Sequence, residues 1–176
     1  MVKYQKRKVL MKFFYPDVYI KSAYELDGEY LSSLGIKVVI FDIDNTLVPY
    51  SVQDMPEKTE EFLAHLEENG ITPCFVSNNG KERVERFNGG KRFALYKGGK
   101  PSKKAALKVA KHFGVQANNI AVVGDQIFTD ICFGKNAGAM TVLCPPIDPK
   151  NEPWYFVFKR LGEKIILYFY GKRKNK

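Results

Sequence analysis

Cysteine is scarce in this chain, and long apolar runs are absent. The three cysteines, Cys74, Cys132 and Cys144, form no CxxC pair, so neither a disulfide framework nor a thiolate zinc site is indicated. No apolar stretch approaches the roughly 20 residues that span a bilayer. Lys12 and then Pro16-Asp17 interrupt the N-terminal apolar run too early for a secretory signal. We therefore expect a cytoplasmic protein and exclude a polytopic membrane protein.

Signatures of several common enzyme classes are also missing. The two histidines, His65 and His112, fall inside expected helices, and no GxSxG motif is present. The phosphate-binding motif GxxxxGK[ST] is absent as well, because Gly99-Lys100 is followed by Pro101. A Ser/His/Asp hydrolase and a P-loop kinase or GTPase are thus disfavoured.

Charge is abundant but unevenly distributed. The 176 residues include 28 Lys and Arg against 19 Asp and Glu, for a net charge of +9. Residues 1–25 carry six bases and two acids, and residues 150–176 carry eight bases and two acids, which leaves the part between them nearly neutral. Both ends are also rich in aromatic residues. We therefore interpret the two ends as candidate docking elements on a neutral body.

The middle of the chain alternates short apolar runs with helical stretches. The expected strands cover residues 37–42, 71–76, 92–96, 120–123 and 140–143, and the expected helices cover 56–69, 101–113 and 127–136. This alternation predicts one Rossmann-like, three-layer α/β domain with a parallel sheet. We expect an N-terminal extension at 1–35 that packs on the core, a core at 36–148, and an amphipathic basic segment at 149–176.

The first expected strand ends in Asp42-Ile43-Asp44-Asn45-Thr46. Carboxylates beside an apolar sheet are costly unless they are paired or bind a cation, although a solvated turn is the simpler interpretation of such a pair. An EF-hand loop is disfavoured, because Leu47 stands at its glycine position and Gln53 at its final glutamate position.

Polar residues also follow the later strands. Ser77 and Asn78 come after the second strand, Lys100 opens a helix, and Asp125 follows the strand at 120–123, with Asp130 five residues on. Singly, such residues could cap a helix, carry surface charge or form a turn. Because parallel strands present their carboxyl ends at one edge, the full set predicts a ligand site there.

This ordered set resembles the four motifs of the haloacid dehalogenase (HAD) superfamily of aspartate-based phosphatases. The motifs are Asp42-x-Asp44-x-Thr46, Ser77, Lys100 and Gly124-Asp125 with Asp130, and the resemblance covers roughly residues 36–144. The surroundings of Ser77 and Lys100 are similar to subclass III. The two ends look like those of bacterial relatives of mitochondrial phosphatidylglycerophosphate phosphatase.

The resemblance implies a role for each motif residue. Asp42 would attack phosphorus to form an aspartyl-phosphate, and Asp44 would act as general acid and then base. Mg²⁺ would be held by Asp42, Asp125 and the backbone carbonyl of Asp44, while Asp130 would bind it through water or orient Lys100 from the second shell of the site. The phosphoryl oxygens would be contacted by Thr46, Ser77, Asn78 and Lys100, with Thr46 mainly orienting the loop.

The spacing between the motifs leaves no room for a large cap domain. Thr46 and Ser77 are 31 positions apart, and Ser77 and Lys100 are 23 apart. Each gap fits one helix and one strand but no further folded unit. An open site would admit a bulky substrate, such as a lipid head group or a macromolecule, more easily than it would select a small metabolite.

Apolar and aromatic residues of the C-terminal segment recur at helical spacing. They are Trp154, Val157, Phe158, Leu161, Ile165 and Tyr168. Lys159, Arg160 and Lys164 lie off that line, a basic tail follows at 172–176, and Pro153 suits a helix start, so the segment could lie on an anionic membrane surface. It could equally pack on the sheet edge or on a second copy of the chain.

We therefore expect a Mg²⁺-dependent phosphomonoester hydrolase, with phosphatidylglycerophosphate as the implied substrate and peripheral docking at the inner face of the membrane. Two alternatives stay open. One is a soluble phosphatase for a nucleotide, a sugar phosphate or a phosphoprotein, and the other is a ribosome- or nucleic-acid-associated module with a HAD fold. A purely binding role is disfavoured, because a scaffold has no use for a nucleophile and its acid.

Overall fold

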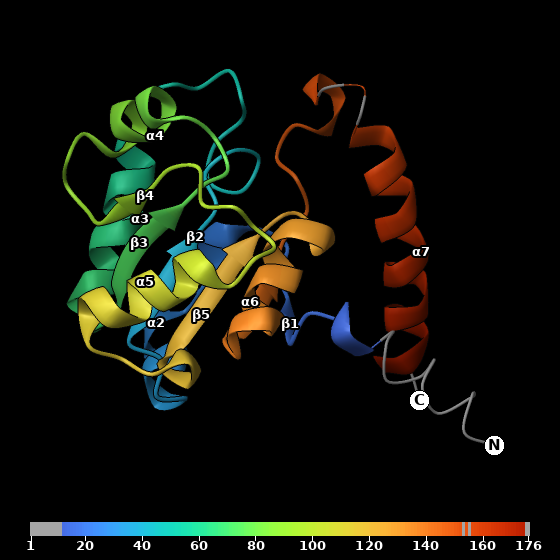
Figure 1. Cartoon of the computed structure of the whole chain (residues 1–176), viewed down its shortest axis with the longest axis horizontal. Helices are drawn as coiled ribbons and strands as arrows, with labels where there is room; N and C mark the ends of the chain where they lie inside the picture. Colours follow the sequence, from blue (N-terminus) through green and yellow to red (C-terminus); the bar gives the residue numbers. More distant parts are fainter. Residues whose placement is uncertain (1–11, 153, 155, 175–176) are drawn as a thin grey trace.

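A parallel six-stranded sheet forms the centre of the computed structural model, which describes residues 12–152, 154 and 156–174 (Figure 1). The strands follow the order β1-β6-β5-β2-β3-β4, and every neighbouring pair is parallel. Their bounds are Val18–Tyr19 (β1), Val38–Phe41 (β2), Thr72–Val76 (β3), Ala94–Leu95 (β4), Ile120–Gly124 (β5) and Met140–Leu143 (β6). The expected α/β fold with a parallel sheet is confirmed.

Helices connect the strands and cover both faces of the sheet. The α-helices are Gly28–Ser33 (α2), Glu57–Glu68 (α3), Lys81–Asn88 (α4), Lys104–Phe113 (α5), Cys132–Ala137 (α6) and Phe156–Lys174 (α7). Short 3-10 helices occur at Ala23–Glu25, Ala117–Asn119 and Pro149–Asn151, and a π-helical turn spans Ile127–Ile131. The helix expected at 127–136 is therefore divided in two. The helix expected from residue 101 begins at Lys104, after a turn in which the Ser102 N–H donates to the Gly99 carbonyl.

Two apolar clusters fix these layers. On one face, side chains of α2, α3 and α4, such as Leu31, Leu63 and Phe87, pack with inward-facing residues of β2, β3 and β5. On the other face, Val109 of α5 and Phe133 of α6 pack with alternate residues of the same strands. Complete burial of a large apolar side chain contributes about 1.5–3 kcal/mol. The alternation along each buried strand thus holds one helical layer on each side of the sheet.

The carboxyl end of the sheet carries only short connections. The β2-to-β3 connection contains one helix, α3, and the segment between β3 and α5 contains only α4 and the two-residue β4. The expectation that no large separate cap is present is confirmed. Within the described part of the chain, no helix is both long and apolar enough to cross a membrane.

Helix α7 stands at the side of the molecule next to β1 and the π-helical turn (Figure 1). Its Ile166 and Leu167 pack on a small cluster of Ile127, Ile131 and Leu143. One face of the C-terminal segment therefore contacts the core of its own chain. Residues 1–11, Pro153, Tyr155 and 175–176 lie outside the described part, as do the side chains at 172–174. Four of the N-terminal bases and the side chains of the basic tail are therefore not described.

Candidate active site

The first motif leaves the sheet as a tight loop. Asp42 continues β2 through a hydrogen bond from its N–H to the Val123 carbonyl, and Asp44 forms a bridge with Val48. Asn45, which directly follows Asp44, has a φ of 62°. Asparagine tolerates this left-handed backbone conformation better than most residues. Because the loop directly follows β2, both carboxylates stand at the carboxyl edge of the sheet, and both residues are buried there.

Lys100 is the buried cation of the site. Its Nζ atom donates to Asp42 Oδ1 and to Asp130 Oδ1, both at 2.6 Å, and its side chain is 3 % exposed. Burial disfavours the ammonium form, but the charges of Asp130 and Asp42 outweigh that effect and raise the pKa of Lys100. Lys100 therefore stays charged beside Asp42. Asp130, whose role the sequence left open, contacts Lys100 directly.

Three buried carboxylates could hold a metal ion. Ligand atoms of Asp42, Asp125 and Asp130 all lie within 4.8 Å of one another. Burial raises the pKa of Asp42 to about 7, with Lys100 opposing the rise and Asp130 adding to it. Burial and the Asp130 charge also raise the pKa of Asp125. Lys100, together with Arg160 on Asp125, balances only two of the three carboxylate charges. An all-oxygen donor set of this kind suits a hard divalent cation such as Mg²⁺.

Asp44 lies in a separate hydrogen-bond network. Its Oδ2 accepts from Asn79 Nδ2 at 2.5 Å, and its Oδ1 accepts from Arg83 Nε and Nη2 at 3.1 and 2.8 Å. The Asp44 carboxylate is not part of the triad, so the metal role assigned to this residue depends on its backbone carbonyl alone. Sequence reasoning missed Asn79 and Arg83, although Asn79 directly follows the second motif.

The remaining motif residues surround these carboxylates. Thr46 Oγ1 donates to Asp125 Oδ1 at 3.3 Å, and Ser77 Oγ accepts from the Asn79 N–H at 3.1 Å. The Asn78 side chain exchanges two hydrogen bonds with the Lys100 backbone, at 2.8 and 3.0 Å. In this structure Asn78 and Thr46 thus hold other site residues, while Ser77, Asn78 and Lys100 line one small polar pocket with Asp42 and Asp44.

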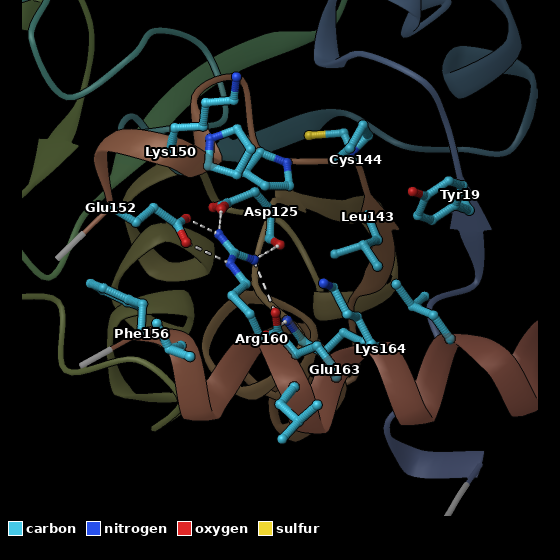
Figure 2. Close-up of a pocket in the computed structure, with 17 residues that line it drawn as sticks. Tyr19, Asp125, Leu143, Cys144, Lys150, Glu152, Phe156, Arg160, Glu163 and Lys164 are labelled. Atoms are coloured by element: carbon cyan, nitrogen blue, oxygen red, sulfur yellow. Dashed lines mark hydrogen bonds and ion pairs between the residues drawn. The ribbon is translucent and has the colours of Figure 1, made fainter. Parts of the chain in front are cut away.

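Sequence reasoning also missed a cluster from the C-terminal part of the chain. Arg160 of α7 lies between Asp125, Glu152 and Glu163 (Figure 2). The helical pattern had placed Arg160 off the apolar line, but nothing in the sequence showed that this face turns toward Asp125. Phe156 and Lys159, from the first turn of α7, line the same pocket as Asp42.

Comparison with known proteins identifies the family of this chain. A family model described as mitochondrial PGP phosphatase matches residues 5–146, and the chain belongs to this PGP phosphatase (YqeG-like) family of HAD-superfamily phosphatases. The "Probable phosphatase YqeG" of Bacillus subtilis is 32% identical over 161 residues, covering 90% of this chain and 92% of that protein. This chain is thus a HAD-type phosphatase, as the motifs predicted.

More distant relatives differ in length or share only the fold. The chloroplastic/mitochondrial phosphatidylglycerophosphate phosphatase 1 of Arabidopsis thaliana is 32% identical over 155 residues, which cover 81% of this chain and 44% of that protein. Among solved structures, the cobalt-bound deoxy-D-mannose-octulosonate 8-phosphate phosphatase (YrbI) from Haemophilus influenzae has a TM-score of 0.52 at 20% identity, covering 67% of this chain and 72% of that one. This likeness concerns the fold alone.

Proposed function

We propose that this chain is a Mg²⁺-dependent phosphomonoester hydrolase that works through an aspartyl-phosphate on Asp42 and acts on a lipid phosphate such as phosphatidylglycerophosphate. The observation that carries the proposal is the meeting of Asp42, Lys100 and two further carboxylates, Asp125 and Asp130, at one buried point. A nucleophile, a fixed cation and an oxygen donor set are the parts that phosphoryl transfer to a carboxylate requires.

The chain's own residues divide the work as follows. Lys100 holds Asp42 Oδ1, which leaves the other carboxylate oxygen to attack phosphorus. Asp44, fixed by Asn79 and Arg83, donates a proton to the leaving oxygen and then accepts one from the water that cleaves the acyl-phosphate. When bound, Mg²⁺ supplies positive charge at the phosphoryl oxygens.

The lipid substrate is supported by the open site and by the similarity to phosphatidylglycerophosphate phosphatase 1 of Arabidopsis thaliana. The polar pocket at Asp42 has a volume of about 100 Å³, which suits a phosphate group and little more. The rest of a substrate would extend outside it, past Phe156 and Lys159 of α7. A bulky lipid head group fits this arrangement better than a metabolite that must be recognised on all sides.

We further propose that α7 docks this cytoplasmic protein on an anionic membrane surface. Four apolar side chains of the helix stand out from the body with 55–75% of their surface exposed: Val157, Phe158, Leu161 and Ile165. Lys159 and Lys164 are exposed beside them, and Glu163, the one acidic residue between 156 and 174, is turned inward and buried. An apolar stripe with cations and no outward acid is complementary to anionic lipid, with about 1 kcal/mol per basic residue near the surface.

Activity is tested with Asp42→Asn. The wild-type chain should hydrolyse p-nitrophenyl phosphate in Mg²⁺, and D42N should lose about a thousandfold or more in kcat, because it lacks the nucleophile. Retained turnover in D42N would contradict the covalent mechanism.

Substrate choice is tested with a panel that includes phosphatidylglycerophosphate in mixed micelles beside nucleotides, sugar phosphates and phosphopeptides. Preference for a soluble phosphate would replace the lipid proposal. RNA binding with a steep salt dependence and no turnover would favour the nucleic-acid-associated alternative.

Docking is tested by flotation with vesicles. Wild-type protein should float with vesicles that contain anionic lipid and not with neutral ones, and the double variant Phe158→Ser, Leu161→Ser should remain in the soluble fraction. Leu107→Ser is the matched control, because Leu107 is also 50% exposed but lies on α5. Equal flotation of the double variant and the wild type would contradict the docking proposal. Equal binding of the wild type to neutral and to anionic vesicles would contradict it as well.

A further inference from the structure

Arg160 connects α7 to the candidate metal site. Its Nη1 atom donates to the Asp125 carbonyl oxygen at 2.8 Å and to Glu163 Oε2 at 2.9 Å, while Nη2 contacts Asp125 Oδ2 and Glu152 Oε1 (Figure 2). Nε donates to Glu152 Oε2 at 3.0 Å. These five hydrogen bonds match the five N–H groups of a guanidinium, a set that a lysine ammonium cannot make.

The contact fixes Asp125 from both sides. Arg160 contacts its Oδ2, and Thr46 donates to its Oδ1. The Asp125 side chain is fully buried, and a buried carboxylate without partners would be costly. With one oxygen held by each neighbour, the carboxyl plane has a single favoured orientation toward Asp42 and Asp130.

The two glutamates on Arg160 each hold a loop of the site. Glu163 Oε1 accepts from the Ile127 N–H at 2.6 Å and from the Phe128 N–H at 3.4 Å, at the start of the π-helical turn that carries Asp130. Glu152 Oε1 accepts from Asn45 Nδ2 at 3.0 Å, inside the first motif. Through these partners, Arg160 links α7 to both segments that supply metal-ligand candidates.

We propose that Arg160 is a positioning residue that holds Asp125 in the orientation needed to bind the divalent cation. The proposal rests on the metal dependence proposed above, and it assigns to α7 a part in the metal site in addition to docking. A guanidinium beside a ligand also repels the cation, and this repulsion by itself would weaken metal binding. The two effects predict opposite changes when Arg160 is removed.

The test measures binding of Mn²⁺, as a spectroscopic probe, to the whole protein without substrate, by the electron paramagnetic resonance signal of the free ion. Arg160→Gln should bind Mn²⁺ about 10- to 100-fold more weakly than the wild type, the usual effect of removing a partner of a ligand. Arg160→Lys should recover only part of this affinity, because one ammonium cannot bridge Asp125 and both glutamates. Lys108→Gln removes an exposed charge from α5 and should leave the affinity within about threefold of the wild type, because exposed charges contribute little.

Unchanged or tighter Mn²⁺ binding in a folded R160Q would overturn the proposal. Wild-type affinity in R160K would also overturn it, because a positive charge alone would then be sufficient at this position. If R160Q does not fold, Glu163→Gln gives the same decision. It keeps an oxygen for the Ile127 N–H but weakens the hold on Arg160, so at least a threefold loss of affinity is expected and wild-type affinity would overturn the proposal.

Turnover separates this proposal from the proposed function. At saturating Mg²⁺, R160Q should regain most of the wild-type kcat on p-nitrophenyl phosphate, while its half-saturating Mg²⁺ concentration rises by the factor seen for Mn²⁺. A wild-type protein that binds Mn²⁺ but hydrolyses no phosphomonoester would refute the proposed function and leave the metal-binding result standing. A wild-type protein that is active while R160Q binds Mn²⁺ normally would refute the role of Arg160 alone.

Discussion

Arg83 holds Asp44 from outside the recognised motifs. Both of its contacts reach one carboxylate oxygen, and both side chains are largely buried, at 13% and 5% exposed. A charge-assisted hydrogen bond of this kind contributes about 1.5–3 kcal/mol, which corresponds to about 10- to 100-fold in rate. Because Asp44 is the proposed general acid and base, losing this pair should lower kcat by that factor. We predict that reduction for Arg83→Gln, measured with p-nitrophenyl phosphate at saturating Mg²⁺.

Arg86 provides the matched control on the same helix. It forms a similar two-bond pair with Asp54, but both side chains are more than half exposed. Exposed pairs contribute little, so Arg86→Gln should leave kcat within about twofold of the wild type. Equal losses in R83Q and R86Q would mean that α4 as a whole matters, and not the Asp44 contact.

The motif residues could be predicted because each lies within a few residues of the end of a strand, and the geometry of a parallel sheet then brings them together. Their partners could not. Arg83 lies 39 positions from Asp44, and Arg160 lies 35 from Asp125. Such a pairing depends on how the helix is rotated about its axis when it packs. The hydrophobic pattern predicts which face turns toward the core, but not which side chain on that face meets a given partner.

At the level of elements, the end of β5 is packed directly on Asp130. A side-chain carbon at Gly124 would collide with the Cβ and carboxyl group of Asp130. Gly124→Ala should therefore displace Asp130 from Lys100, weaken Mn²⁺ binding and cost about 1–3 kcal/mol of stability through overpacking. Binding by paramagnetic resonance and unfolding by denaturant would measure the two effects.

Gly171→Ala on α7 is the control for Gly124→Ala. Nothing lies within 4 Å of the added carbon there, and the residue is exposed on a helix. Alanine in place of a helical glycine should raise stability slightly, by up to about 1 kcal/mol, with metal binding unchanged. Normal Mn²⁺ affinity in G124A would contradict the close packing of β5 on Asp130.

Sequence patterns predicted the main elements but not the short strand β1 or the division of the helix expected at 127–136. The long strands β2, β3, β5 and β6 lie where apolar runs predicted them. The two-residue β1 was not anticipated, because pairing with β6 and the hydrogen bonds between Asp17 and Thr141 place it, and two residues carry no periodicity. The helix expected at 127–136 begins as a π-helical turn, and Glu163 of α7 accepts the first N–H groups of that turn, those of Ile127 and Phe128. The hydrophobic pattern carries no sign of this tertiary contact.

At the level of the whole molecule, the buried acids link stability to pH. In the metal-free protein the pKa of Asp42 is raised to about 7, above the value of an unfolded chain, so its neutral form is the one that folding favours. The stability associated with this group is complete below the unfolded pKa and is lost as pH rises through about 7. We predict that the Tm of metal-free protein, relative to D42N, falls by several degrees between about pH 5 and pH 8.

Adding Mg²⁺ should reverse that trend, because a cation binds the ionised carboxylates and releases their protons. The increase in Tm with excess Mg²⁺ should be small at about pH 5 and grow toward pH 8, measured by thermal unfolding at matched ionic strength. The same increase at every pH, or a metal-free Tm that rises with pH relative to D42N, would contradict the charge balance of the site.

Helix α7 is not a separable module of this protein. The membrane docking proposed for its outer side does not make α7 an interchangeable tag that can be cut off or replaced without harm to the enzyme. The inner side of α7 carries Arg160 and Glu163, so exchanging the whole helix would also remove the contacts that they make with Asp125 and with the π-helical turn. Changing the surface on which this enzyme docks would therefore require substitutions at outward positions, such as Phe158 and Leu161, with the inner side of the helix kept unchanged.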